Sequence, residues 1–201
     1  MAPDRARRDI VRRALASLII LLLIVPTASA ALSAETLHLE TGAGRFIFQD
    51  PSEHTGKKVP VWYFKPKDFT PDTPIVFVMH GVSRNADGYR DNWIYLAEHH
   101  KLLILVPEFS KKTFPRSHGY ALGGVMARSG GGDRTPAPES KWAFYIVDRI
   151  FDRVRAALPT RQTRFALFGH SAGAQFVHRY MTFTGGEKVA IALAANAGWY
   201  T

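Results

Sequence analysis

The sequence predicts an α/β domain with a mostly parallel sheet and helices on both of its faces. Apolar segments of strand length alternate along the chain with helical segments, the order that produces parallel strands joined by right-handed crossovers. Two of these segments, 75–79 and 102–106, are uninterrupted apolar runs, as expected of strands buried on both faces. A stripe of apolar residues in i, i+4 steps over 142–158 predicts an amphipathic helix packed on that sheet.

The first half of the chain predicts strands before helices. Residues typical of β-strands occur in short runs, and segments containing Gly and Pro separate these runs and predict turns. A helix is expected at about 91–100, between the two buried strands. The predicted strands are 36–40, 45–49, 59–65, 75–79 and 102–106.

The second half begins with a long segment without a clear period. Residues 111–140 are rich in Gly and contain several prolines, so we expect a long loop there. The segments that follow are a helix at 142–158, a strand at 164–168, a helix at 174–184 and a strand at 189–195. On the first of these helices, Arg149, Arg153 and Arg155 are expected on the solvated face. Four tryptophans are expected in the core or lining a pocket: Trp62, Trp93, Trp142 and Trp199.

Composition excludes several classes of protein. The 201 residues suffice for one domain, and 46% apolar against 21% charged residues is a globular balance that argues against disorder. Without cysteine, disulfides, thiolate zinc sites and cysteine nucleophiles are excluded. The net charge is +9, with five arginines and two aspartates in the first thirty residues. Because no basic stripe with interleaved aromatic residues is present, nucleic-acid binding is not expected.

The first thirty residues resemble an export signal. Arginines between residues 5 and 13 precede an apolar run at 15–25, and Ala28-Ser29-Ala30 follows it. This pattern is typical of a cleavable secretory signal peptide, and it predicts a periplasmic or secreted protein whose mature domain is 31–201. The alternative is an uncleaved anchor, but the apolar run is shorter than the ~20 residues that span a bilayer.

The pentapeptide Gly169-His170-Ser171-Ala172-Gly173 carries the predicted chemistry. It fits G-x-S-x-G and lies between a predicted buried strand and a predicted helix, where this motif forms a sharp turn that exposes the serine. Small residues are needed at both ends because they crowd one another. Ser171 is therefore the candidate nucleophile, and the helix N-terminus that follows favours an oxyanion.

A second motif, His80-Gly81-Val82, directly follows the buried strand at 75–79. In serine hydrolases with a nucleophile on such a turn, one oxyanion donor is a backbone N–H after this strand and the other is the residue after the nucleophile. The candidate donors are Val82 and Ala172, and Gly81 allows close approach of the backbone. The imidazole of His80 is expected to organise the loop; the alternative is that it acts as general base.

The chain resembles secreted α/β-hydrolases related to poly(3-hydroxybutyrate) depolymerases and feruloyl-esterase-like enzymes. The resemblance covers about 36–201 and implies an α/β-hydrolase fold and ester hydrolysis through an acyl-serine intermediate. The segments that carry it are 76–81, 84–89, 138–142, 168–176 and 196–200.

The catalytic triad of this fold runs in the order Ser, Asp or Glu, His, and the sequence does not complete it. After Ser171 the only acid is Glu187 and the only histidine is His178, seven residues along the same helix. We therefore expect a C-terminally truncated hydrolase with its last strands missing, so that strand 189–195 is an uncovered edge. The alternative is a catalytically dead, exported binding protein on a hydrolase scaffold.

The predicted function is that of an exported serine hydrolase acting on carboxylic esters, with a small-molecule or polymeric ester as substrate. Neither a cofactor nor a metal is expected, since no ligand spacing such as H-E-x-x-H is present. His99 and His100 are expected at the surface near a helix end. The sequence does not decide the substrate or the oligomeric state.

Overall fold

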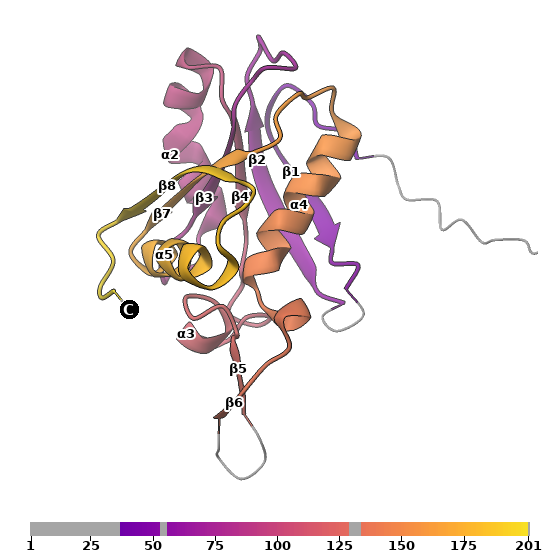
Figure 1. The fold of residues 1–201 in the computed structure, drawn as a ribbon. Coiled ribbons are helices and arrows are strands. Elements are labelled where there is room, and N and C mark those ends of the chain that lie inside the picture. Colours follow the sequence, from indigo (N-terminus) through magenta and orange to yellow (C-terminus); the bar gives the residue numbers. More distant parts are fainter. Residues whose placement is uncertain (1–36, 53–55, 129–133, 201) are drawn as a thin grey trace, which may run out of the picture. The chain divides into compact units, whose positions relative to one another are not determined.

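The computed structural model describes residues 37–52, 56–128 and 134–200, and these build a six-stranded sheet (Figure 1). The strand order is β1-β2-β4-β3-β7-β8, and the four strands β4, β3, β7 and β8 are parallel. β2 runs antiparallel to both β1 and β4, so the predicted mostly parallel sheet is confirmed. The bounds of the strands are β1 Gly42–Gln49, β2 Lys58–Lys65, β3 Ile75–Met79, β4 Leu103–Pro107, β7 Phe165–His170 and β8 Val189–Ala195.

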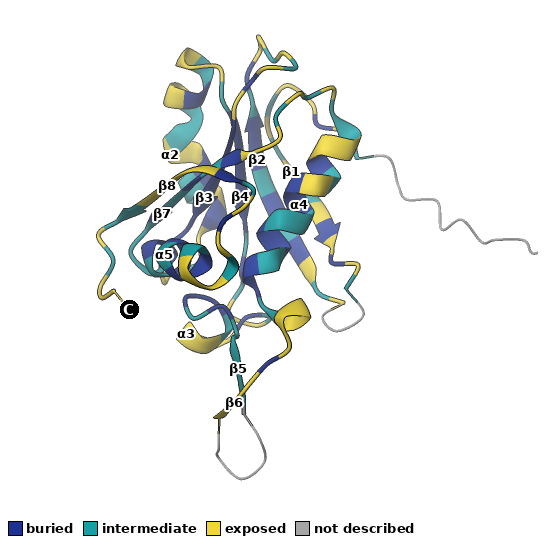
Figure 2. Ribbon diagram, in the orientation of Figure 1, coloured by how far each residue is buried: buried dark blue, intermediate teal, exposed yellow. Residues whose placement is uncertain are grey.

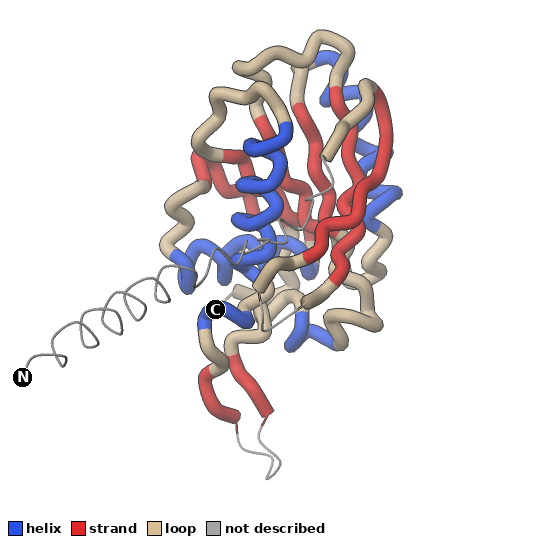
Figure 3. The backbone as a smooth tube through the Cα atoms, turned by 90° about the vertical axis from the view of Figure 1, so that its right-hand side faces the viewer, coloured by secondary structure: helices blue, strands red, loops and turns tan. Residues whose placement is uncertain are grey.

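Helices cover both faces of this sheet, as predicted (Figure 3). The helix α2 (Ala86–His99) packs with Val76, Val78, Ile104 and Val106. On the other face α4 (Phe144–Ala157) and α5 (Ala172–Thr184) share a larger core with the intervening strand residues, among them Phe77. Since successive strand residues point to opposite faces, these two clusters lie on opposite sides of β3 and β4.

The two apolar runs are buried, apart from the partly exposed Leu102 at the start of the second. Every residue of β3 and of β4 is buried, which explains why neither strand shows the alternation of a half-exposed strand. The boundaries of β3 and β8 agree with the prediction, and those of β4 and β7 differ by one or two residues. The three apolar residues of the α4 stripe, Ile146, Ile150 and Val154, are fully buried.

The first predicted strand is wrong. Residues 37–40 form no strand, and β1 instead begins at Gly42, inside the segment expected to be a turn. A Cβ at Gly44 would lie 2.7 Å from Cε1 of Tyr63 on the paired strand, so this glycine lets the ring lie flat against the backbone. Gly44 therefore serves the packing of the strand pair, although its place among closely spaced glycines had predicted a turn.

The prediction of a structureless loop at 111–140 is also wrong. The described part of it forms a short helix and a two-stranded hairpin, followed by a 3₁₀ turn: α3 Arg116–Gly119, β5 Met126–Arg128, β6 Arg134–Pro136 and η1 Glu139–Lys141. Gly123 has a φ of +64° and lies against the ring of Phe144. Local hydrogen bonds and the burial of Phe114 and Tyr120 in the core also order the segment, although it shows no hydrophobic period.

Arg149 is not on a solvated face. Its guanidinium donates two hydrogen bonds to Asp50, from Nε at 2.8 Å and from Nη2 at 2.9 Å, and the Asp50 side chain is fully buried. This bidentate pair joins α4 to the chain just after β1, across 99 residues of sequence. A helical wheel does not reveal it because the partner carboxylate comes from another element.

The edge of the sheet at β8 is largely uncovered (Figure 2). In the described chain β8 pairs with β7 alone, and Ile191 and Leu193 are 59% and 56% exposed. This agrees with the predicted uncovered edge, and such an edge can pair with another chain.

None of the described helices is long and apolar enough to cross a membrane. The segment read as a signal peptide lies outside the described residues.

Candidate active site

Ser171 lies on the turn that joins β7 to α5. Its backbone has φ +55° and ψ −116°, a strained combination for a residue with a side chain. The turn is held by two hydrogen bonds: Ser171 N–H donates to the Ala195 carbonyl at 3.0 Å, and Gln175 N–H donates to the Ser171 carbonyl at 3.1 Å. The strand and the helix both extend to this residue, so the strain is imposed by the fold.

The two glycines that flank this turn are in contact. A Cβ on Gly169 would overlap the backbone carbonyl of Gly173 and lie 2.7 Å from Cγ2 of Val177. A Cβ on Gly173 would overlap the Met79 carbonyl oxygen and lie 2.8 Å from the His80 carbonyl oxygen. The N-terminus of α5 therefore packs directly on the backbone at the end of β3.

The loop after β3 passes beside Ser171. β3 and β7 are neighbours with Met79 opposite Gly169, which brings the two predicted motifs to one edge of the sheet. A Cβ on Gly81 would lie 3.9 Å from Cβ of Ser171. The Val82 side chain is 67% exposed, and its N–H donates no hydrogen bond to any of the described residues. Ala172 is the first residue of α5, where an N–H has no acceptor within the helix.

His80 is fully buried behind this loop. Its Nε2 accepts a hydrogen bond from the Phe109 N–H at 3.0 Å, which leaves the proton on Nδ1, facing the Gly81 carbonyl at 3.1 Å. The Tyr120 hydroxyl donates to the His80 carbonyl at 2.7 Å. Burial lowers the pKa of His80 to about 4, with a smaller contribution from Arg84. Both ring nitrogens are engaged, so the geometry favours a loop-organising role over that of a base.

The burial of His80 predicts a loss of stability in acid. The folded pKa of about 4 lies below the ordinary value of 6.5, so between these values only the unfolded chain takes up this proton. Stability should fall as the pH drops from 6.5 to 4, with about 3 kcal/mol lost through His80. Urea unfolding across this range measures it, with His80→Gln as the comparison. If the two proteins lose stability in parallel, His80 is not responsible.

Two residues near the site were not singled out for a role by sequence reasoning. Tyr89 lies in the first turns of α2, and its hydroxyl is 3.0 Å from Nδ1 of His170. Arg84, with φ +64°, donates from Nη2 to the Arg116 carbonyl at 2.9 Å and lies over the ring of Tyr120. The predicted helix began at Asp91, which left Tyr89 in a loop. A helix start at Ala86 would have placed Tyr89 near the motif loop.

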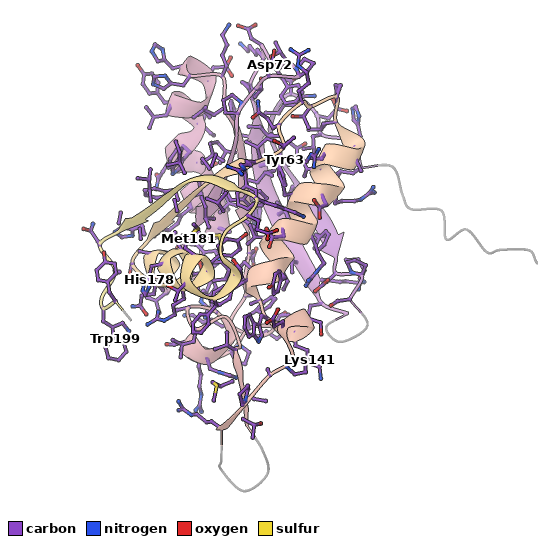
Figure 4. The ribbon with its side chains drawn as sticks, in the orientation of Figure 1. Tyr63, Asp72, Lys141, His178, Met181 and Trp199 are labelled. Carbon is purple, nitrogen blue, oxygen red and sulfur yellow. The ribbon has the colours of Figure 1, made fainter. Side chains whose placement is uncertain are left out.

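Other predicted residues lie apart from this chemistry. The ring of His178 is 5.1 Å from that of Tyr200, and Figure 4 shows it on α5 beside the segment that carries Trp199. Trp199 is 69% exposed and donates from Nε1 to the Gln175 side chain at 3.1 Å, so this tryptophan does not lie in the core. Glu187 is exposed. In the described ranges no three His, Cys, Asp or Glu side chains gather as a metal site requires.

Two solved structures are similar to this chain over most of its length. The poly(aspartic acid) hydrolase-1 of Sphingomonas sp. KT-1 is 42% identical, with a TM-score of 0.73 over 81% of this chain and 59% of its own. A poly(3-hydroxybutyrate) depolymerase from Bordetella parapertussis is 36% identical, with the same TM-score, over 81% of this chain and 54% of its own. The chain thus spans between half and two thirds of the length of these two proteins.

More distant structures share the architecture alone. A fluorophosphonate-binding serine hydrolase of Staphylococcus aureus is 19% identical, with a TM-score of 0.54 over 77% of this chain and 58% of its own. No protein-family model and no curated protein matches the chain.

Proposed function

Since this chain is a member of the α/β-hydrolase fold family and resembles a poly(3-hydroxybutyrate) depolymerase and a poly(aspartic acid) hydrolase, we propose that it serves ester hydrolysis with Ser171 as nucleophile. The observation that carries the proposal is the strained Ser171 turn lying beside the Gly81 loop. Strain of this kind at a polar residue is typical of functional sites. No other described serine is held in the left-handed region.

The reaction would proceed in two displacements. Ser171 Oγ attacks the ester carbonyl carbon and loses its proton to a general base, while the N–H groups of Val82 and Ala172 stabilise the negative oxygen. The bond to the alcohol oxygen breaks, the alcohol takes the proton from the base, and an acyl-serine remains. Water then attacks the acyl carbon and releases the acid. Among the described residues no histidine is hydrogen-bonded to Ser171, so the base is not assigned.

A fluorophosphonate probe tests this proposal on the full-length gene product. The expected result is one covalent adduct, located on Ser171 by mass spectrometry of the digested protein. An adduct elsewhere, or none under conditions that label a known serine hydrolase, contradicts the proposal. The second outcome would favour the alternative of an exported binding protein without activity.

A cationic rim favours an anionic polymer as the substrate class. No Asp or Glu occurs from Phe109 to Arg128, whereas Lys111, Lys112 and Arg116 are all exposed there. This segment follows β4, and Ser171 follows β7. Since these strands are parallel, both lie at the C-terminal ends of the strands. The hydrogen bond from Arg84 to the Arg116 carbonyl connects the segment to the Gly81 loop. Basic side chains near a reactive group raise the local concentration of anionic substrate. The Sphingomonas neighbour is by its name a hydrolase of such a polymer.

Charge reversal on this rim should therefore discriminate between substrates. In the variant Lys111→Glu/Lys112→Glu we expect about a tenfold lower kcat/KM for poly(aspartic acid) at low salt, and no change for neutral p-nitrophenyl butyrate. Poly(aspartic acid) is a polyamide, so in the same acyl-serine step an amine takes the place of the alcohol as leaving group. The control is Lys67→Glu/Lys101→Glu, which makes the same charge change at the N-terminal ends of the parallel strands, away from Ser171. An equal effect of both double variants would contradict local recognition, and so would no effect of either.

We also propose that the protein is exported, because residues 1–30 have the pattern of a cleavable signal. N-terminal sequencing of the protein recovered from the periplasm or medium should begin at Ala31. An intact N-terminus in the cell membrane would instead indicate an uncleaved anchor.

A further inference from the structure

One side chain touches both motifs of the candidate site. The hydroxyl of Tyr89 lies 3.0 Å from Nδ1 of His170, the residue before Ser171. The same oxygen would be 2.9 Å from a Cβ on Gly81, so it packs against the Cα of the loop that presents Val82. Tyr89 belongs to α2, which reaches neither motif through its backbone.

The hydrogen bonds of the Gly81 loop do not involve the serine turn. The Gly81 carbonyl faces Nδ1 of His80 and accepts from the Arg84 N–H at 3.2 Å, and the His80 carbonyl accepts from Tyr120. These partners hold the loop to the core and to its own turn, and His80 and Tyr120 are fully buried. Tyr89 is partly exposed, and its hydroxyl joins the loop to the serine turn through His170.

We propose that Tyr89 is a positioning residue, whose hydroxyl sets the distance between the Val82 and Ala172 N–H groups by pinning Gly81 against the His170 end of the serine turn. Two donors must meet the same oxyanion, and each is useful only within about 2.7–3.1 Å of it. Displacement by about 1 Å costs about 100-fold in rate. The inference rests on the proposed function, since only an oxyanion formed at Ser171 would require this spacing.

Tyr89→Phe tests this in the full-length protein, because it removes one oxygen and keeps the ring. We expect kcat for p-nitrophenyl butyrate to fall about 10-fold with KM changed less than twofold, and the melting temperature to stay within about 2 °C. The control is Tyr95→Phe, on the same helix with a side chain 77% exposed. A role in packing alone would move the melting temperature and leave kcat unchanged.

The partner variant His170→Phe separates the bridge from independent effects. If the hydrogen bond between the two residues sets the geometry, Tyr89→Phe/His170→Phe should be no slower than the slower single variant. Two results overturn the inference, provided that Ser171 still labels with fluorophosphonate. One is a double variant whose loss of kcat is the product of the two single losses. The other is full activity in Tyr89→Phe. If the wild-type protein neither labels nor turns over, the proposed function fails first and this inference fails with it.

Discussion

Replacing Ser171 by alanine should abolish ester turnover and leave the fold unchanged. In triad enzymes the loss of the serine nucleophile costs about 10⁶-fold in kcat, because no acyl-serine can form and only the oxyanion donors and substrate binding remain. Alanine keeps the Cβ, so the strained backbone at φ +55° is retained. The measurement is p-nitrophenyl butyrate hydrolysis by the full-length protein, with circular dichroism to check folding.

The matched control is Ser83→Ala, which removes an exposed hydroxyl from the turn after Gly81. It should retain activity within about threefold, since a surface substitution is nearly neutral. Activity of Ser171→Ala at the level of Ser83→Ala would mean that turnover takes place at another residue. That result would leave the fold assignment intact and remove the proposed nucleophile.

Adding a methyl group at Gly173 should damage stability and activity together. The new Cβ would overlap the Met79 carbonyl oxygen and lie 2.6 Å from its carbonyl carbon. Because both atoms belong to the backbone of β3, no side-chain rotation relieves the clash, and α5 must move away from the sheet. We expect Gly173→Ala to lower the free energy of unfolding by more than about 3 kcal/mol. Activity should fall at least about 100-fold through misplacement of Ser171.

Gly88→Ala is the control for Gly173→Ala. Gly88 also lies near the start of a helix, α2, but a Cβ there meets only the side-chain nitrogen of Asn85, at 3.1 Å. Alanine is preferred to glycine within helices, so this variant should be neutral or more stable by up to about 1 kcal/mol. Urea unfolding compares the two. Equal stability of both variants would show that α5 packs less tightly on β3 than the structure has it.

Local pattern was enough to predict much of the fold. The runs 75–79 and 189–195 were predicted to the residue as β3 and β8, because an apolar run bounded by turn residues leaves little choice of register or length. The apolar stripe of α4 was likewise predicted from its i, i+4 period. The pentapeptide at 169–173 was expected between a strand and a helix. In the structure only Ser171 lies between them, because β7 and α5 extend into the motif from either side.

The sequence by itself determined the α/β class, the buried strands and the strand–serine–helix order, because each depends on neighbours within a few residues. Only the tertiary structure decided which strands are adjacent and hence that Gly81 lies beside Ser171. The Tyr89–His170 bond spans 81 residues, and the Asp50–Arg149 pair spans 99. Partners this far apart leave no period or spacing in the sequence, since their meeting depends on how β-strands order themselves across a sheet.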